Sequence, residues 1–293
     1  MITVLGASGN VGSKVAHAAI DSGQHVVVVG RDGAKLQKLG ERGAAVRVGD
    51  ISNTSWLVDA LAGSDAVFAM QPSNPFAPDY ANEQDRFGSS ICAAITKNAI
   101  STVVALSSLG ADRADAPGVI GALHRQERRL AALDADRVII SRPVSFFENF
   151  SPAVDQLTDS GTHVDSVRKD LPIPMIATAD IAYAAVRALT DITWSGFAHI
   201  TLLGQRDISY DEATVVLGEA LGLDTARYQQ LPYEAMLGVL TEIGLSADYA
   251  RHYVEMTRAF NSGELTDPVA RTEANTTTTR FEDFARSLAG RSS

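Results

Sequence analysis

The sequence predicts an α/β protein built on a doubly wound parallel sheet, with a smaller and mostly helical region toward the C-terminus. From residue 1 to about 142, short apolar runs alternate with segments of helical periodicity. These runs are almost continuously apolar, as expected for strands that are covered on both faces. The first run leads directly into a glycine-rich turn.

The expected strands follow one another with helical segments such as GSKVAHAAIDSG between them. In chain order the strands are ITVL, HVVVV, AAVRV, DAVFAM, STVVAL and RVIIS. Strands that alternate with helices pair in parallel, because each helix returns the chain to the same end of the sheet. A further strand, FAHITLLG, is expected at residues 197–204.

The chain loses this regular alternation after the sixth run. FFENFSPAVDQL predicts a helix, THVDSV a short edge strand, and ADIAYAAVRAL a returning helix that Thr178 or Asp180 caps. Beyond Gly204 the pattern is mostly helical, and the spacing of Ser209 and Glu212 predicts a capping box.

The composition is that of an ordinary globular protein. The chain has 293 residues, of which 45% are hydrophobic and 20% charged, enough to bury a full core. Its net charge of −10 argues against a nucleic-acid partner, since phosphate binding needs clustered Lys and Arg. Without a signal peptide or a long apolar run, we expect a cytoplasmic protein with no membrane partner. Because Cys92 is the single cysteine, the chain forms no intrachain disulfide. The sequence does not exclude a homodimer.

The turn after the first strand has the form of a dinucleotide-binding loop. It reads Gly6-Ala7-Ser8-Gly9-Asn10-Val11-Gly12 and leads straight into a helix. Glycines here permit a tight turn and let the backbone approach a pyrophosphate, while the helix N-terminus presents free N–H groups. A glycine-rich turn without a ligand is the plainer interpretation, but the order strand, turn, helix, strand favours nucleotide binding.

The end of the second strand indicates which nucleotide binds. An acidic residue there binds the adenosine ribose of NAD, whereas an arginine receives the 2′-phosphate of NADP. Gly30-Arg31-Asp32 follows VVVV, so we expect NADP(H) to be preferred over NAD(H), with Arg31 on the phosphate. Asp32 is interpreted more simply as a helix N-cap. After the third strand, Asp50 and Ile51 are placed to meet the adenine, and a turn role for Asp50 is as well supported.

Four segments carry a family resemblance. They are VLGASGNVG with Arg31, LSSLGA after the fifth strand, LHRQERRL and SRPVSFFENF, of which the last two are the more specific. On these segments nearly the whole chain resembles the NmrA-like group of atypical short-chain dehydrogenases, and in particular its quinone-oxidoreductase and triphenylmethane-reductase-like members. We expect a Rossmann domain over 1–150, completed by 175–204, and a smaller substrate or lid region over 151–174 and 205–293.

The resemblance also implies where the nicotinamide lies, at the carboxyl edge of the sheet. The residues that it places near the ring are Met70, Gln71, Pro72, Ser107 and the segment from Pro143 to Phe147, in particular Pro143 and Phe146. The region after residue 150 would close over this site.

One departure from the parent superfamily bears on the chemistry. That superfamily uses a Tyr-x-x-x-Lys pair on the helix after the fifth strand, where Lys lowers the pKa of Tyr. Here the helix reads VIGALHRQERRL, and Ile120 and His124 occupy the two positions. Alcohol oxidation by that route is therefore not expected. Two functions stay open. One is a reductase that needs hydride and only a modest proton source, and the other is a nucleotide sensor that catalyses no reaction.

The same helix carries Glu127 within its apolar stripe of Ile120, Leu123 and Leu130. His124, three residues earlier, can lie beside it on the helix surface. One interpretation is that Glu127 ties down a loop while His124 packs against its neighbours. The other is that Glu127 orients His124 toward the ribose or the substrate.

Ser107, which leaves the fifth strand, is a third catalytic candidate beside His124 and Glu127, although serines are common there for turn reasons. The remaining histidines and the cysteine lack metal-ligand spacing, so no metal is expected. Some large side chains of the C-terminal half either line a site for a flat apolar substrate or pack in the core. They are Phe146, Phe147, Tyr233, Tyr249, Tyr253 and Met256.

Together these features predict an NADPH-dependent reductase that passes hydride to a small conjugated or quinone-like acceptor, with the proton coming from His124, Ser107 or water. The alternative is a redox sensor of the NmrA type that binds NADP(H) without turnover. The aromatic side chains of the C-terminal region favour the enzyme.

Overall fold

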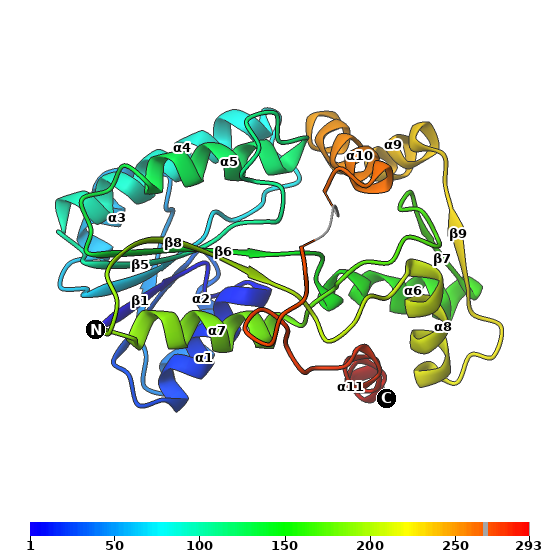
Figure 1. Cartoon of the computed structure of the whole chain (residues 1–293), viewed down its shortest axis with the longest axis horizontal. Coiled ribbons are helices and arrows are strands. Elements are labelled where there is room, and N and C mark those ends of the chain that lie inside the picture. Colours follow the sequence, from blue (N-terminus) through cyan, green and yellow to red (C-terminus); the bar gives the residue numbers. More distant parts are fainter. Residues whose placement is uncertain (266–268, 293) are drawn as a thin grey trace.

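One seven-stranded sheet organises the protein (Figure 1). The structure is a computed structural model that describes residues 1–265 and 269–292. The strand order is β3-β2-β1-β4-β5-β6-β8, and all neighbouring pairs are parallel. The strands are β1 (Ile2–Leu5), β2 (Val26–Gly30), β3 (Ala45–Val48), β4 (Ala66–Ala69), β5 (Thr102–Leu106), β6 (Arg137–Pro143) and β8 (Gly196–Leu202). The predicted doubly wound α/β fold is therefore confirmed.

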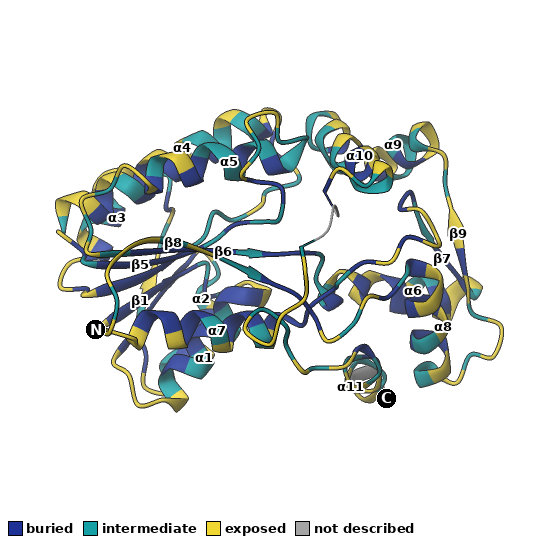
Figure 2. Ribbon diagram, in the orientation of Figure 1, coloured by how far each residue is buried: buried dark blue, intermediate teal, exposed yellow. Residues whose placement is uncertain are grey.

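Helices cover both faces of this sheet. On one face lie α1 (Asn10–Asp21), α2 (Gly33–Gly40) and α7 (Thr178–Thr190), and on the other α3 (Thr54–Ala60), α4 (Tyr80–Lys97) and α5 (Val119–Leu130). Strands β1, β2 and β4 are buried along their whole length, which explains their continuously apolar sequences (Figure 2). We call the sheet with these six helices the sheet part. Within the described residues no helix has the length and apolar character needed to cross a bilayer.

The remaining elements form what we call the C-terminal part. They are η1 (Phe147–Phe150), α6 (Ser151–Ser160), β7 (Thr162–Asp165), α8 (Tyr210–Leu221), β9 (Arg227–Gln230), α9 (Tyr233–Glu242), α10 (Ala247–Ser262) and α11 (Phe281–Ser292). Strand β7 was expected, and it pairs in parallel with β9, which was not. The β9 sequence RYQQ offers little pattern because Tyr228 is its one buried side chain.

Two local predictions of helix starts are confirmed. The Ser209 hydroxyl accepts the N–H of Glu212 at 3.1 Å and caps α8, which is the serine half of the predicted capping box, while the Glu212 carboxylate pairs with Arg206 at 2.8 Å. The Asp32 carboxylate accepts the N–H of Lys35 at 3.0 Å and caps α2, which favours the N-cap interpretation of this residue.

The predicted cap of α7 is wrong. Its N-cap is Ala177, and Thr178 is already the first helical residue, so neither Thr178 nor Asp180 caps the helix. The carboxylate of Glu148, from η1, accepts the N–H of Thr178 at 3.0 Å instead. A side chain distant in sequence therefore satisfies a donor that is usually satisfied locally.

Candidate functional site

The loop between β1 and α1 holds its glycines in close backbone contact. Gly6 has a φ of +67°, in the left-handed region that favours glycine. A Cβ on Gly12 would lie 2.3 Å from the carbonyl oxygen of Gly6, so α1 packs directly on the loop. A Cβ on Gly9 would meet that oxygen at 3.3 Å and nothing else nearby. Gly12 therefore serves helix packing, while Gly9 is exposed at the N-terminus of α1.

A cavity of about 250 Å³ opens beside this loop, where the strand order reverses between β1 and β4. Such switch points are where open parallel sheets bind ligands. The lining residues are Gly6, Ser8, Gly9, Gly30, Arg31, Gly49, Asp50, Ile51, Met70, Pro72, Ser73 and Phe87. They include most of the residues predicted to contact the nucleotide. Of the others, Val11 and Gly12 are buried residues of the first turn of α1.

Individual residues of this cavity have distinct roles in its shape. A Cβ on Gly30 would lie 3.0 Å from the Ser8 hydroxyl oxygen, so glycine keeps the end of β2 open. Arg31 follows it and is exposed on the wall. The Asp50 carboxylate accepts the N–H of Ser52 at 2.9 Å, so Asp50 forms a turn and also lines the cavity. Glycine backbone, a helix N-terminus and an exposed guanidinium together fit an anionic dinucleotide.

A buried ion pair joins α5 to the exits of β5 and β6. Glu127 is 6% exposed and accepts hydrogen bonds from the Ser107 hydroxyl at 2.5 Å and from Arg142 Nε at 3.0 Å. Its second oxygen accepts from Arg142 Nη2 at 2.5 Å. His199 of β8 approaches the same carboxylate at 3.8 Å, and burial followed by the charge of Arg142 lowers the pKa of His199. This geometry favours the interpretation of Glu127 as a structural tether, and the groups that it holds are Ser107 after β5 and Arg142 of β6.

Sequence reasoning missed Arg142. A signal was present, because Glu127 stands in an apolar stripe and a buried charge needs a partner of opposite charge. Arg142 directly follows the expected strand RVIIS, one element later, and is that partner. The Ser107 hydroxyl is itself 6% exposed and engaged with Glu127, so it faces the protein interior.

His124, on the same helix as Glu127, contacts a different part of the chain. Its Nδ1 donates to the carbonyl oxygen of Ala111 at 2.8 Å. A carbonyl oxygen only accepts, so the neutral ring carries its proton on Nδ1 and keeps a lone pair on Nε2. The Ala111 carbonyl, rather than Glu127, therefore orients His124. The half-buried ring retains one nitrogen for a ligand.

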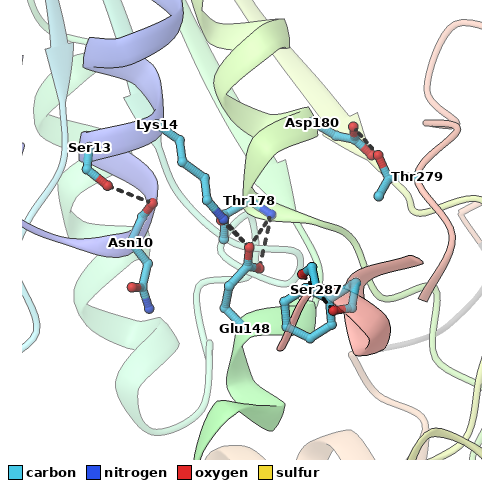
Figure 3. A network of polar contacts seen from close by, with 9 residues as sticks. Asn10, Ser13, Lys14, Glu148, Thr178, Asp180, Thr279 and Ser287 are labelled. Atoms are coloured by element: carbon cyan, nitrogen blue, oxygen red, sulfur yellow. Dashed lines mark hydrogen bonds and ion pairs between the residues drawn. The ribbon is translucent and has the colours of Figure 1, made fainter. Parts of the chain in front are cut away.

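A second carboxylate, that of Glu148, links α1 to the segment after β6 (Figure 3). Lys14 of α1 donates to Glu148 and to the hydroxyl of Thr178, and that hydroxyl donates to Glu148 at 2.5 Å. The side chain of Glu148 is 10% exposed. Helix α1, η1 and the start of α7 are thus held together by one carboxylate.

Some of the large side chains singled out from the sequence pack in the hydrophobic core, and others pack where the C-terminal part contacts the sheet part. Phe147 packs edge to face on Phe281 in the C-terminal core, with ring centroids 5.1 Å apart. Tyr249 packs on Tyr80 at 5.3 Å, next to the loop after β4. Tyr233 lies under the guanidinium of Arg258. Phe146 packs against the sheet core and Met256 beside α5.

No group of three or more His, Cys, Asp or Glu side chains in the described ranges is arranged to hold a metal ion. A parallel sheet with a glycine loop and a cavity at its switch point defines a dinucleotide-binding protein of the Rossmann type. The NmrA-like family model matches residues 1–285, and the chain belongs to the NmrA-like family.

Two of the proteins that this chain resembles are named as reductases and a third as a quinone oxidoreductase. The chain is 28% identical over 237 residues to (4-alkanoyl-5-oxo-2,5-dihydrofuran-3-yl)methyl phosphate reductase of Streptomyces griseus, covering 80% of this chain and 78% of the relative. It is 24% identical over 250 residues to the NAD(P)H azoreductase of Xenophilus azovorans, covering 85% and 84%. The solved NADPH-dependent quinone oxidoreductase of Escherichia coli, complexed with NADPH, is similar with a TM-score of 0.75, 21% identity and coverage of 98% and 99%.

Proposed function

We propose that this protein is an NADPH-dependent reductase that transfers hydride to a small conjugated or quinone-like acceptor, acting in the cytoplasm. The observation that carries the proposal is the cavity at the switch point, with the glycine loop on one wall and Arg31 on another. The named activities of the relatives support reduction as the reaction class and NADPH as a hydride donor.

The nucleotide would lie along the carboxyl edge of the sheet. The backbone around Ser8, Gly9 and Asn10 at the start of α1 would hold the pyrophosphate. Arg31 would receive the 2′-phosphate, because a guanidinium matches its oxygens in a charge-assisted, bidentate geometry. Asp50 and Ile51 would contact the adenine.

The nicotinamide half would extend toward the exits of β4 and β6. The residues that would surround it are Met70, Gln71, Pro72, Pro143 and Phe146. His124 would offer Nε2 to the nicotinamide ribose, since its Nδ1 is already engaged. When bound, the reduced nicotinamide supplies the hydride, and the protein must exclude water and provide a proton.

The alternative is a nucleotide sensor without turnover. It is favoured by the absence of the Tyr and Lys pair from α5, where Ile120 is buried and His124 bonds the backbone. Both functions share nucleotide binding, so the decisive difference is whether an acceptor is reduced.

Two measurements on the purified protein test the proposal. NADPH and NADH are titrated by calorimetry, and NADPH consumption is then followed with quinones, azo dyes, triphenylmethane dyes and unsaturated lactones. Tighter binding of NADPH with consumption by at least one acceptor class is the expected result. Tight NADPH binding without any consumption would establish the sensor, and a lack of binding to either nucleotide would refute both functions.

A further inference from the structure

The two edge strands of the sheet differ in how well they are protected from pairing with another chain. Strand β3, at one edge, is four residues long and carries Arg47 in its sequence AVRV. Strand β8, at the other edge, is seven residues long, and its sequence GFAHITL holds no Lys, Arg, Asp, Glu or Pro. Its pairing with β6 runs without a bulge from Gly196 to Leu202. Natural edge strands are usually short or blocked by charge, proline or a bulge, and β8 has none of these protections.

The backbone of β8 turns alternate residues away from the sheet. The N–H of Gly196 donates to the carbonyl oxygen of Asp136, which precedes β6, at 2.8 Å. In a parallel ladder the N–H and C=O of one residue point to the same side, and those of the next residue point to the opposite side. The outward-facing residues of β8 are therefore Phe197, His199 and Thr201.

The chain itself covers this edge at one position only. The next outward-facing residue is Leu203, whose N–H donates to the carbonyl oxygen of Asn275 at 2.8 Å and whose carbonyl oxygen accepts the N–H of Thr277 at 2.9 Å. Within residues 1–265 and 269–292, nothing bonds the outward backbone groups of Phe197 or Thr201, nor those of the residue between them. We call residues 197–201 the open edge, and it ends where the 275–277 segment begins to pair.

The side chains of the open edge are apolar or uncharged and in part exposed. Phe197 is 42% exposed, and its ring packs edge to face on His199 with centroids 4.8 Å apart. Burial and the charge of Arg142 lower the pKa of His199, so its ring is neutral at pH 7. The open edge thus carries no charge on a chain whose net charge is −10. Two copies of such a chain repel each other, and they can approach most easily along a neutral surface.

We propose that the open edge of β8 pairs with the open edge of a second copy of this chain. The two strands run antiparallel about a twofold axis at His199, so that Phe197 of each copy lies opposite Thr201 of the other. Residues that face each other in this way exchange both their N–H···O=C bonds, and every outward backbone group of the open edge then has a partner. The inference goes beyond the proposed function and does not rest on it.

The length of the open edge favours a second β8 over an unrelated extended peptide. A peptide that continued past Thr201 would meet the 275–277 segment, which already occupies the edge at Leu203. A second β8 begins at Gly196, so its ladder ends at the residue that faces Thr201. On the other face of the strand, Ala198 lies opposite Ile200 of the second copy, which adds an apolar cross-strand pair at each side of the axis.

The proposed interface lies away from the nucleotide cavity. Strands β5 and β6 separate β8 from β4, and the cavity lies between β1 and β4. Pairing would therefore extend the sheet across two copies and leave both cavities open. Because a ladder of this length buries little side-chain area, we expect association in the micromolar range and not an obligate dimer.

A proline variant tests the backbone bonds of the open edge. Thr201→Pro removes an outward N–H and leaves every bond between β8 and β6 in place. It should weaken dimerisation about 30-fold or more, because each dimer loses both copies of this bond. Thr201→Val keeps the N–H and the branched shape and should dimerise like wild type. Sedimentation over the micromolar range measures all three proteins, and NADPH titration should give the same affinity in each.

Single-cysteine variants test the register without a change to the backbone. In the proposed pair, residue 198 of one copy and residue 200 of the other have Cα atoms about 4.5 Å apart, within reach of a disulfide. Like positions are about 8 Å apart and beyond that reach. A mixture of Ala198→Cys and Ile200→Cys should therefore form disulfide-linked dimers, and either variant alone should not. Burial raises the pKa of the Cys92 thiol to about 11, which keeps the native cysteine unreactive.

The outcomes separate this interface from other arrangements. A wild-type chain that stays monomeric through the micromolar range would overturn the proposal. A dimer that Thr201→Pro does not weaken, or that fails to crosslink in the mixture, would show that the copies meet elsewhere. If Thr201→Pro does not fold, the crosslinking of the mixture decides. A wild-type chain that dimerises in this register but binds no nucleotide would refute the proposed function alone.

Discussion

The two parts of the molecule treat buried titratable groups in opposite ways. In the sheet part, the buried carboxylate of Glu127 is paired with Arg142, and Glu148 is paired with Lys14 of α1 where the two parts meet. In the C-terminal part, burial keeps groups neutral, as the lowered pKa of His163 shows. A paired charge ties a helix to the sheet through a specific contact, whereas a titratable group that is buried without a partner stays neutral.

The largest effect is expected from breaking a pair in the sheet part. Arg142→Met leaves Glu127 buried without its cation, which should cost about 3–5 kcal/mol in the free energy of unfolding. Arg125→Met removes a cation from the half-exposed pair with Asp85 and should cost less than about 1 kcal/mol. Urea unfolding measures both.

A double variant sharpens this first prediction. Glu127→Leu combined with Arg142→Met replaces the pair by apolar side chains and should recover most of the lost stability. If Arg142→Met costs no more than Arg125→Met, the sheet part does not depend on paired charge and the contrast between the two parts is lost.

The second expected effect concerns the nucleotide itself. A guanidinium on a phosphate contributes roughly 1.5–3 kcal/mol, so Arg31→Ala should weaken NADPH binding about ten- to a hundredfold and NADH binding little. Arg47→Ala removes an exposed arginine on the neighbouring strand β3 and should have a smaller effect. Equal affinity of wild type for the two nucleotides in calorimetry would contradict the assignment.

The sequence predicted the features that depend on neighbouring residues. The apolar runs predicted the seven parallel strands, and Asp32 and Ser209 cap their helices as their spacing indicates. Each depends on residues within one or two turns of chain. The glycine loop belongs here too, since its close contact between Gly6 and Gly12 is local.

Features that depend on distant partners were not predictable in the same way. Glu148 caps α7 from thirty residues earlier, and Tyr253 meets Asp165 from a separation of eighty-eight. No periodicity encodes such a meeting, because it depends on how whole elements pack. Glu127 shows the intermediate case, in which the need for a partner was visible and the partner was not.

The third prediction tests whether His163, in the C-terminal part, is neutral in the native protein. His163 has a native pKa of about 4, below the unfolded value, so the unfolded chain binds more protons as pH falls. Stability present at pH 7 should decrease by about 2 kcal/mol on going to pH 5, because the unfolded pKa is near 6.5. His163→Asn, which removes the titration, should lose less over this range in urea unfolding. Equal losses in the two proteins would show that His163 is charged in the native state.

The smallest expected effect tests whether His124 on α5 binds the nucleotide or supplies the proton. With Nδ1 held by the Ala111 carbonyl, His124 can offer one hydrogen bond through Nε2, worth about 1 kcal/mol. His124→Ala should therefore weaken NADPH binding about fivefold and change kcat for quinones little, as calorimetry and steady-state kinetics would show. A fall of about 10²–10⁴-fold in kcat at unchanged NADPH affinity would instead identify His124 as the proton donor. Because hydride alone neutralises a cationic triphenylmethane dye, reduction of such a dye should be spared in that case.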